Sequence, residues 1–580
     1  VTVSNRLGVG LTLRFVGLRF DWMGEGVYLY GGDSEKPHRL DPGDSATFGI
    51  GFNVPANASA GPHRVYLVLV YEVDGVEHRE VVQAEPPFNV AEVVTVTFTE
   101  TFTTTVYTQP GVEAPPQRRP LWALIGVAVS GVSALILFLA YRRGVSGKRG
   151  GLMNSSEVKA QVSKVFDPRR DRFDLWFLIL FLAGLALRVL WLDKPEGSLI
   201  FDEKYYVNVA RIILGLPHDP DVYPDAPPGL DPNHEHPFLA KGLIALSMRV
   251  LGDNPWGWRI PSVVFGSLSL LLFYLLVKRV SGRSDLALLA SFILNFDNLF
   301  YVHGRIATLD VFMMGFMLLG FYLYASGRHL LSALSLALST LCKLGGLYGF
   351  AVIIVYHFLH ELWRVRGEGG AAEGKIEWTR LFEWLERYAL VYAASGILLL
   401  ALMDRLWVGY SNPFDHMAFI YEYTKALTRE VPEGIESYPW QWLLNEVKIP
   451  YLTVNVNVYQ DSRLVRTYPS IAFTGAMNPL LIYLAVPSVI YAAYSFYEDR
   501  RGYTLLTVLW FALTYLPFYP MSIFGHRIMY LFYFLNTVPA VALGISHLIL
   551  DQRPPRIVVL AYCIAVLVGY YWMFPFRQVP

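Results

Sequence analysis

From residue 120 to the C-terminus, the sequence is a succession of apolar runs separated by short polar segments. About 20 apolar residues in a helix suffice to cross a hydrocarbon core of roughly 30 Å. Inside that core every backbone polar group needs a partner, and a helix supplies one within the segment itself. The pattern predicts a polytopic α-helical membrane protein, with spans at 120–141, 173–192, 258–280, 285–302, 307–325, 329–341, 345–363, 387–409, 478–497, 503–521, 527–549 and 557–575.

The overall composition points the same way. Charged residues make up only 17% of the 580 residues, whereas soluble domains carry about a quarter. The net charge is zero, which gives no sign of a nucleic-acid partner. The two cysteines, Cys342 and Cys563, are too few for a disulfide framework or a cysteine-based metal site. The chain begins at Val1 rather than Met, which is what removal of a leader would leave.

Lysine and arginine mark one side of the membrane. Short cytoplasmic loops carry an excess of these residues. Alternate threading of the spans places six such groups on one side, namely Arg142 to Arg172, Lys278 to Arg283, Arg328, Arg364 with Arg366, Arg500 with Arg501, and Arg553 with Arg556. The long connections 193–257 and 410–477 then lie outside the cell membrane. We therefore expect any active site at the extracytoplasmic face of a multi-pass protein.

Residues 1–98 differ from the membrane region. Residues 11–15 alternate apolar and polar side chains, and residues 65–71 form a β-branched and aromatic run. Clusters of Gly, Pro and Asp separate such segments. This pattern predicts an extracytoplasmic β-sandwich of the immunoglobulin-like type over residues 1–98.

The remainder divides by composition. Residues 99–119 are rich in Thr and Pro, which suits an extended stalk without a core of its own. Residues 120–141 predict an extra transmembrane helix, and residues 142–172 a cytoplasmic linker. Residues 173–580 are expected to form the main membrane domain.

Several cations break the charge pattern, because they sit at the outer ends of expected helices. They are His303 and Arg305 in one turn, Lys343 in a second, and His526 with Arg527 in a third. Arginine binds a phosphate through parallel hydrogen bonds and lysine acts as a point charge. The cations Arg305, Lys343 and Arg527 are therefore candidates for holding a lipid-linked phosphate. The alternative is that each anchors a helix end at the interface by snorkelling.

Two acids, Asp202 and Glu203, open a helical segment in the first outer connection. The apolar residues of this segment fall on one face, which suits a helix at the membrane surface. Neighbouring side chains on a helix point about 100° apart, so the two carboxylates do not share a proton. We expect one to act as a base and the other to position a partner. The alternative for Asp202 is a capping role at the helix N-terminus.

Two histidines follow in the run His234-Glu235-His236-Pro237. A His-x-His pair can ligate a metal, to which Glu235 could contribute. However, Pro237 favours an extended backbone at His236, and no fourth ligand follows at a usual spacing. We therefore expect hydrogen-bonding or structural histidines and no required cofactor, with a divalent metal as the alternative.

A further acid, Asp310, lies seven residues after His303 and five after Arg305. We expect Asp310 to contact the substrate. The alternative is a buried ion pair between Asp310 and Arg305.

Several motifs together resemble the protein O-mannosyltransferases of the GT-C superfamily, in the prokaryotic and archaeal type without a MIR domain. The resemblance implies the GT-C fold of eleven membrane helices with an active site in outward loops. Eleven spans also remain here once 120–141 is set aside. The motifs, which keep the family's order over residues 165–575, are Phe201-Asp202-Glu203, His234-Glu235-His236-Pro237, Leu239-Ala240-Lys241, His303-Gly304-Arg305, Lys343-Leu344-Gly345-Gly346, Ser437-Tyr438-Pro439-Trp440, Met477-Asn478-Pro479 and His526-Arg527.

The resemblance also implies roles for single residues. Asp202 matches the acid thought to take the proton from an acceptor Ser or Thr hydroxyl, and Glu203 matches its neighbour. Arg305 matches the family's essential arginine. Lys343 and Arg527 look like the cations near the donor phosphate. We expect His234, His236, His303 and Asp310 to bind substrate.

The activity implied is inverting transfer of a mannosyl residue from a dolichyl- or polyprenyl-phosphate donor to Ser or Thr hydroxyls of extracytoplasmic proteins. The expected partners are this donor, a protein or peptide acceptor, membrane lipids and further subunits in a homo- or hetero-oligomer. One motif has Phe238 and Ala240 where the family commonly has Pro and Gly, which leaves the acceptor open. The alternatives are a GT-C enzyme that modifies a lipid or glycan, as aminoarabinose transferases do, and a transporter or receptor.

Overall fold

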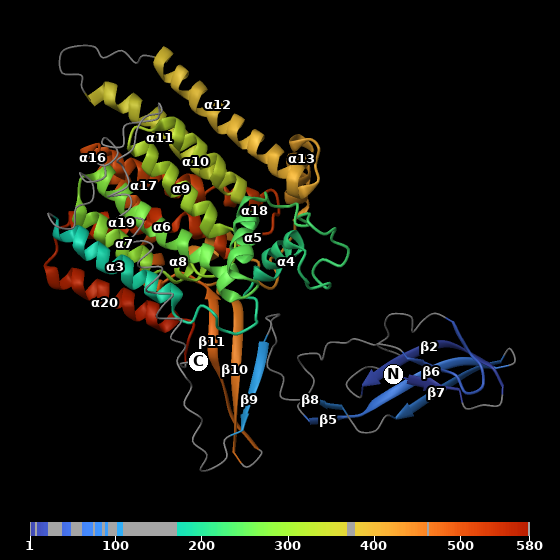
Figure 1. The fold of residues 1–580 in the computed structure, drawn as a ribbon. Coiled ribbons are helices and arrows are strands. Elements are labelled where there is room, and N and C mark those ends of the chain that lie inside the picture. The colour runs from blue at the N-terminus through green and yellow to red at the C-terminus, as the bar shows by residue number, and fades with distance from the viewer. Residues whose placement is uncertain are drawn as a thin grey trace. The chain divides into compact units, whose positions relative to one another are not determined.

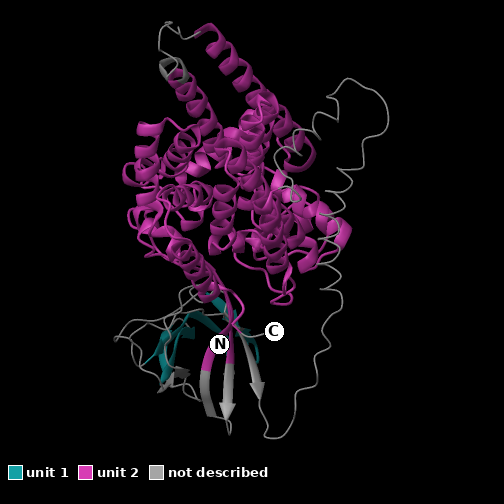
Figure 2. Cartoon of the chain, turned by 90° about the vertical axis from the view of Figure 1, so that its left-hand side faces the viewer, with its two compact units in different colours: residues 1–98 teal, residues 99–580 magenta. Residues whose placement is uncertain are grey.

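The computed structural model describes residues 2–5, 9–20, 37–47, 61–73, 76–83, 88–90, 101–107, 171–367, 378–460 and 463–577. Contacts within the chain divide it into two compact units, residues 1–98 and 99–580 (Figure 2). The expected transmembrane helix at 120–141, the stalk beyond residue 107 and the linker up to residue 170 lie outside the described residues.

The first unit consists of antiparallel strands. Its main sheet has four strands in the order β3-β2-β6-β7 (Figure 1). Leu11, Leu13 and Val16 of β2 are buried, and a register shift after Leu13 moves the buried series by one residue. The immunoglobulin-like assignment stays a prediction. The strands are β1 (Thr2–Ser4), β2 (Leu11–Phe20), β3 (His38–Leu40), β4 (Ser45–Thr47), β5 (Gly61–His63), β6 (Val65–Val73), β7 (Val76–Gln83) and β8 (Phe88–Val90), with β1 paired to β4 and β5 to β8.

Helices dominate the second unit (Figure 1). A π-helix, Asp404–Val408, and a 3-10 helix, Leu531–Asn536, interrupt the α-helical series. The α-helices are α3 (Arg172–Val189), α4 (Glu203–Leu214), α5 (Leu239–Leu251), α6 (Pro255–Ser281), α7 (Ser284–Asn295), α8 (Asn298–His303), α9 (Asp310–Ala325), α10 (His329–Cys342), α11 (Gly346–Gly367), α12 (Trp378–Met403), α13 (Pro413–Ala426), α14 (Pro439–Leu443), α15 (Pro479–Ile482), α16 (Ala485–Asp499), α17 (Gly502–Tyr515), α18 (Phe518–Ile523), α19 (Val538–Asp551) and α20 (Arg556–Met573).

Helix α6 lies at the centre of this unit, where it packs against α3, α5, α7, α9 and α17. Asn254 caps its first turn by accepting the N–H of Trp256 at 3.0 Å. Gly282 ends it in the left-handed conformation, with φ of 68°. Burial on most sides explains why α6 is apolar all round instead of carrying one apolar stripe.

Helices α12 and α20 expose large apolar side chains instead. Leu398 on α12 is 69% exposed, and Tyr571 and Trp572 on α20 are 78% and 74% exposed. Apolar surface of this extent is what lipid chains cover. Six helical segments among the described residues are long and apolar enough to cross a membrane, and four shorter apolar helices accompany them. The chain is therefore a multi-pass membrane protein, and the count of eleven spans stays a prediction.

The expected span 285–302 is divided into α7 and α8. The break falls at Asp297, whose carboxylate accepts the backbone N–H of Phe300 at 3.0 Å and so caps α8. The same carboxylate accepts the N–H of Asn478 at 2.9 Å. Because Asn478 is far away in sequence, the apolar pattern of the span alone did not indicate this break.

The expected span 527–549 begins too early, because no membrane helix starts at residue 527. Helix α19 begins at Val538, with Pro539 in its first turn, where a residue without an N–H is tolerated. Arg527 pairs with Thr428 in an isolated antiparallel bridge. Arg527 thus belongs to a loop that runs beside another connection, and not to a membrane helix.

Three strands extend from the helical unit. β10 (Ile449–Gln460) and β11 (Arg463–Gly475) form an antiparallel hairpin within the long connection 410–477. β9 (Thr101–Tyr107) pairs in parallel with β10 (Figure 1). Threonine is β-branched and fits a strand well. These residues belong to the expected extended stalk, and their pairing with β10 is a contact that the Thr-rich composition did not indicate.

Helix α6 crosses the turn after α8 at close range. A Cβ on Gly266 would lie 2.8 Å from the Cα of Gly304. We expect Gly266→Ala to lower the free energy of unfolding by about 1–3 kcal/mol through overpacking. Gly396→Ala on α12 is the matched control, because its Cβ would meet only Ala337 at 3.9 Å. Melting temperatures of the purified variants test this, and equal values would contradict the close crossing.

Candidate active site

The candidate site surrounds the first turn of α4. Burial, together with the charges of Asp202 and Asp310, raises the pKa of both Tyr206 on α4 and Tyr451 on β10 well above its usual value. Phe201 stacks on Tyr451 with ring centroids 4.1 Å apart. The start of α4, the start of α9 and the hairpin strand β10 therefore meet around one carboxylate, that of Asp202.

The Asp202 side chain is partly exposed and forms no hydrogen bond or ion pair with the residues that the structure describes. The predicted capping alternative is therefore wrong. Partial enclosure removes water from the carboxyl and raises its pKa to about 7. The charge of Asp310 adds to this rise, whereas the charges of Lys343 and Lys204 oppose it. A carboxylate of this kind is suited to taking a proton near neutral pH.

Glu203, predicted beside Asp202 as a catalytic acid, is instead fully buried and completely engaged. Its carboxylate forms a two-bonded ion pair with Arg259 of α6, with both N–O distances 2.8 Å. It also accepts the backbone N–H of Ile200 at 2.7 Å and of Ala307 at 2.9 Å. Glu203 thus ties α4 to α6 and to the turn before α9. Both carboxylate oxygens are thus engaged, which argues against direct chemistry at Glu203 and favours for it the positioning role that was expected of one of the two acids.

Lys343 and Asp310 are brought together. The Lys343 ammonium donates to Asp310 Oδ1 at 2.7 Å, which links the end of α10 to the start of α9. It also lies over the rings of Phe532 and Tyr533, at 4.9 and 5.6 Å from their centroids. The predicted alternative, an Arg305–Asp310 pair, is wrong, because Asp310 is occupied by Lys343.

His303 is buried next to the site and forms hydrogen bonds through both ring nitrogens. One ring nitrogen, Nδ1, is hydrogen bonded to Thr308 Oγ1 at 3.1 Å, and Nε2 to the Tyr451 hydroxyl at 2.8 Å. Both nitrogens are therefore occupied, so the ring holds Tyr451 in place. The predicted direct contact between His303 and substrate is not supported.

Arg305 forms no hydrogen bond with Lys343 or Asp310 and bonds to other residues instead. Its guanidinium donates to the Tyr301 hydroxyl at 2.6 Å and to the carbonyls of Leu190 and Trp191 at 2.9 and 3.0 Å. These carbonyls end α3, where a cation is favoured by the helix dipole. The guanidinium also lies 5.0 Å from the ring centroid of Phe576. The prediction that Arg305 binds the donor phosphate is therefore corrected to a structural role at the end of α3.

A buried lysine organises the connection that carries the two candidate histidines. Lys241 of α5 forms an ion pair with Asp231 at 2.5 Å, and both side chains are fully buried. Its ammonium also donates to the carbonyls of Asn233 and His236, the latter at 2.8 Å. With the side-chain oxygen of Asn233 at 3.3 Å, four acceptors surround this one cation and fix the fold of the segment.

The two histidines of this segment face different neighbours. His234 packs against Tyr410, and its carbonyl accepts a hydrogen bond from His416 at 2.8 Å. Burial lowers the pKa of His236 well below its usual value, and the charges of Lys343 and Arg527 add to this effect. The charge of Lys343 therefore acts on His236, whereas His234 packs against Tyr410 and His416. No three His, Cys, Asp or Glu side chains within the described ranges come close enough to hold a metal.

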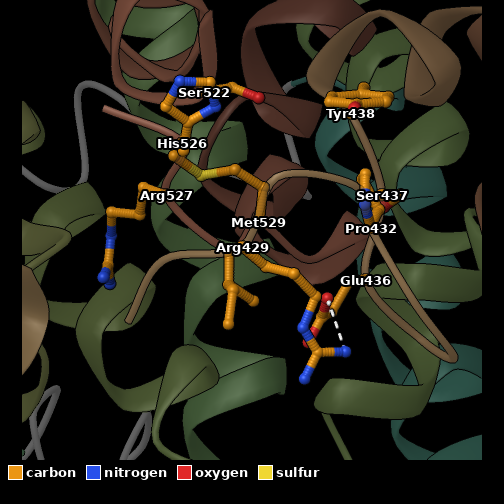
Figure 3. A pocket seen from close by; sticks show the side chains of 10 residues that line it. Arg429, Pro432, Glu436, Ser437, Tyr438, Ser522, His526, Arg527 and Met529 are labelled. Carbon is orange, nitrogen blue, oxygen red and sulfur yellow. Dashed lines mark ion pairs between the residues drawn. The ribbon is translucent and has the colours of Figure 1, made fainter. Parts of the chain in front are cut away.

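Arg527 lies beside a small pocket (Figure 3). In this view its guanidinium points away from the ion pair between Arg429 and Glu436. It donates to the carbonyl of Thr424. Its charge contributes to the lowered pKa of His236, as does that of Lys343, so both cations act on the same imidazole.

Sequence reasoning missed the residues that hold the site together. Arg259, Asp231 and Tyr451 were not singled out, and Lys241 was noted only within a motif. Arg259 falls at the start of the expected span 258–280, and Tyr451 lies 148 residues from its partner His303. No local pattern indicates such pairings, because each partner comes from a separate segment.

The chain is similar to several known proteins. Residues 235–367 match the family model described as dolichyl-phosphate-mannose-protein mannosyltransferase. A polyprenol-phosphate-mannose–protein mannosyltransferase of Mycolicibacterium smegmatis is 24% identical over 70% of this chain and 90% of its own. Its counterpart from Corynebacterium glutamicum is 23% identical over 63% and 80%. The S. cerevisiae Pmt1–Pmt2 complex bound to the sugar donor has a TM-score of 0.50, 12% identity, and coverage of 70% and 89%.

The fold and these matches make the chain similar to membrane-embedded glycosyltransferases of the GT-C class. Within that class, the chain is similar to the protein O-mannosyltransferases, to whose family model residues 235–367 match. All of these relatives are named as mannosyltransferases, which favours an enzyme over the alternative of a transporter or receptor.

The buried pair of Glu203 and Arg259 makes a stability prediction. In Glu203→Gln an amide N–H₂ would face N–H donors, and Arg259 would lose its counter-charge. Breaking such a pair costs about 3–5 kcal/mol, so the melting temperature of the purified protein should fall markedly. The control is Glu433→Gln, which breaks the exposed pair with Arg429 and should change melting little. A Glu203→Gln protein as stable as the control would contradict the positioning role.

Proposed function

We propose that the protein transfers a mannosyl residue from a polyprenyl- or dolichyl-phosphate donor to Ser or Thr hydroxyls of extracytoplasmic proteins. The observation that carries this proposal is the Asp202 carboxylate, which lacks a bonded partner among the described residues and lies within range of the Lys343 charge. The names of the bacterial relatives supply the donor and acceptor classes.

In this mechanism Asp202 takes the proton of the acceptor hydroxyl as its oxygen attacks C1 of the sugar. A Ser or Thr hydroxyl is a weak nucleophile until a base accepts its proton. The C–O bond to the phosphate breaks as the new glycosidic bond forms on the opposite face. One displacement of this kind inverts the anomeric centre.

The leaving lipid phosphate gains negative charge as the bond breaks. Lys343, which is held beside the site by Asp310, and Arg527 are the cations that would stabilise it. Asp310 holds the Lys343 ammonium in one position, which reduces the reorganisation needed during reaction. His236, kept neutral by burial and by these cations, can offer a hydrogen bond to sugar or phosphate.

We further propose that this site faces the outside of the cell, as the distribution of Lys and Arg predicts. The same proposal includes eleven membrane spans with one additional helix before them. It also includes an outer immunoglobulin-like sandwich and assembly into an oligomer. Protease accessibility of engineered tags in the connections 193–257 and 410–477 tests the sidedness.

The decisive assay supplies membranes containing the protein with labelled dolichyl-phosphate-mannose and a Thr-rich peptide. Label on the peptide supports the proposal. Label that enters only a lipid or a glycan would instead assign the enzyme to the alternative GT-C activity.

Asp202→Asn keeps the shape of the side chain but cannot accept the proton. We expect transfer to fall by about 10²-fold or more, since this is the range that a general base contributes. Membrane insertion and melting temperature should be unchanged, because the Asp202 side chain bonds to no described residue. Asp221→Asn, an exposed acid of the same connection, should retain full activity. Activity of Asp202→Asn equal to that control would remove Asp202 as the base.

The raised pKa of Asp202, about 7, predicts a pH dependence. Below this pKa the carboxyl is protonated and cannot act as a base, so activity should fall as pH decreases. Initial rates measured at saturating donor between about pH 5.5 and 8.5 should rise with pH and level off above the pKa. A rate that is constant down to the lowest pH would place the base at an acid with an ordinary pKa.

A further inference from the structure

A second hollow lies at the opposite ends of α9, α10 and α11 from Asp310 and Lys343. It is a cavity of about 610 Å³, lined by the ends of α6, α9, α10, α11 and α17. Helix α9 separates it from the candidate active site by its 16 residues, or about 24 Å. The connections at this end carry the Lys and Arg residues that predict the cytoplasmic side.

Arg279 supplies a cation with free hydrogen-bonding capacity at this cavity. Its Nε donates to the carbonyl of Ala325 at 3.3 Å. The two terminal nitrogens have no partner within the described part of the chain, and the side chain is exposed. A guanidinium in this state presents a planar pair of donors, which matches the oxygens of a phosphate group.

Neutral donors lie beside this cation. The Nδ1 of His329 accepts the indole N–H of Trp384 at 3.1 Å. An indole nitrogen only donates, so the neutral His329 ring carries its proton on Nε2 and is a donor there. His360 and Tyr356 also line the cavity. His360 Nδ1 lies 3.9 Å from a carboxylate oxygen of Glu361, beyond hydrogen-bond distance, and its Nε2 has no hydrogen bond to another described residue. The cavity is therefore rich in donors, with Glu361 as the one acid of its lining.

The lining also has an apolar part. Leu276, Phe321, Ile353 and Leu506 contribute to the wall between the helices. The volume lies in the range of small-molecule sites, and the position at the ends of membrane helices is at the level of lipid headgroups. Basic pockets between membrane helices on the cytoplasmic side suit anionic headgroups.

We propose that this cavity binds the phosphate group of an anionic lipid of the cytoplasmic leaflet. Arg279 pairs with the phosphate oxygens, His329 and His360 donate hydrogen bonds to it, and the apolar wall contacts the first carbons of the acyl chains. The site is separate from the one that contains Asp202 and does not depend on the proposed transfer reaction.

The test uses the full chain purified in detergent, with phosphatidylglycerol as the probe. Phosphatidylglycerol should raise the melting temperature in a saturable manner, and retention of the lipid should be visible by native mass spectrometry. Phosphatidylcholine at the same concentration should have a much smaller effect, since its headgroup has no net charge. Inorganic phosphate without a lipid should have little effect at that concentration.

Two variants locate the binding. Arg279→Gln should weaken phosphatidylglycerol binding by about tenfold or more, which is the loss expected for a hydrogen-bonded charge pair. His360→Ala should weaken it by a smaller factor. The matched control is Arg556→Gln, an exposed arginine at the start of α20 that does not line the cavity. It should bind as the wild type does.

Three results would overturn the proposal. Equal binding by Arg279→Gln and wild type would exclude the cavity as the site. Equal stabilisation by phosphatidylcholine would exclude recognition of charge, and equal stabilisation by inorganic phosphate would exclude the lipid. Because Arg279 is exposed and makes one backbone contact, both arginine variants should fold, and melting without lipid checks this.

Discussion

The buried ion pair between Glu203 and Arg259 is the interaction on which the arrangement of the candidate site depends. Charged groups cost much free energy inside a protein unless they are paired and fully hydrogen bonded. Here the carboxylate receives four hydrogen bonds, two from Arg259 and two from the backbone N–H groups of Ile200 and Ala307. Three segments that are far apart in sequence are thereby fixed together. The neighbouring Asp202 is left at their junction, and its carboxylate forms no hydrogen bond or ion pair with any residue that the structure describes.

This contrast between paired and unpaired acids gives the site its chemical character. Glu203, Asp231 and Asp310 each bind a cation directly, at distances of 2.5 to 2.8 Å. Asp202 lies in the same region and feels the charge of Lys343, but it forms no hydrogen bond with Lys343. Partial loss of water without a bonded counter-ion raises the pKa of a carboxyl group. A bonded cation keeps each of the three paired acids ionised. Asp202 has no such cation among the described residues, so its carboxyl can gain and lose a proton near neutral pH.

Part of this site was predictable and part was not. Asp202, Asp310 and Lys343 were singled out from their positions at the outer ends of helices, and the structure brings these three together. Arg305 and His303 were singled out by the same reasoning, but their polar atoms are taken up by the α3 carbonyls and by Tyr451. Position at a helix end gives the depth of a residue in the membrane. The direction of its side chain depends on neighbours that the local sequence does not contain.

The sequence by itself determined that the chain is a membrane protein built from apolar helices, with strands at its N-terminal end, because these features arise from local periodicity and run length. The motifs also indicated the enzyme class. Only the tertiary structure decided where helices break, as at Asp297, and which acid has no bonded partner among the described residues, as at Asp202. These outcomes depend on hydrogen bonds from remote segments, such as that from Asn478 to Asp297. A local pattern carries no information on contacts of that kind, since they form only when the helices pack.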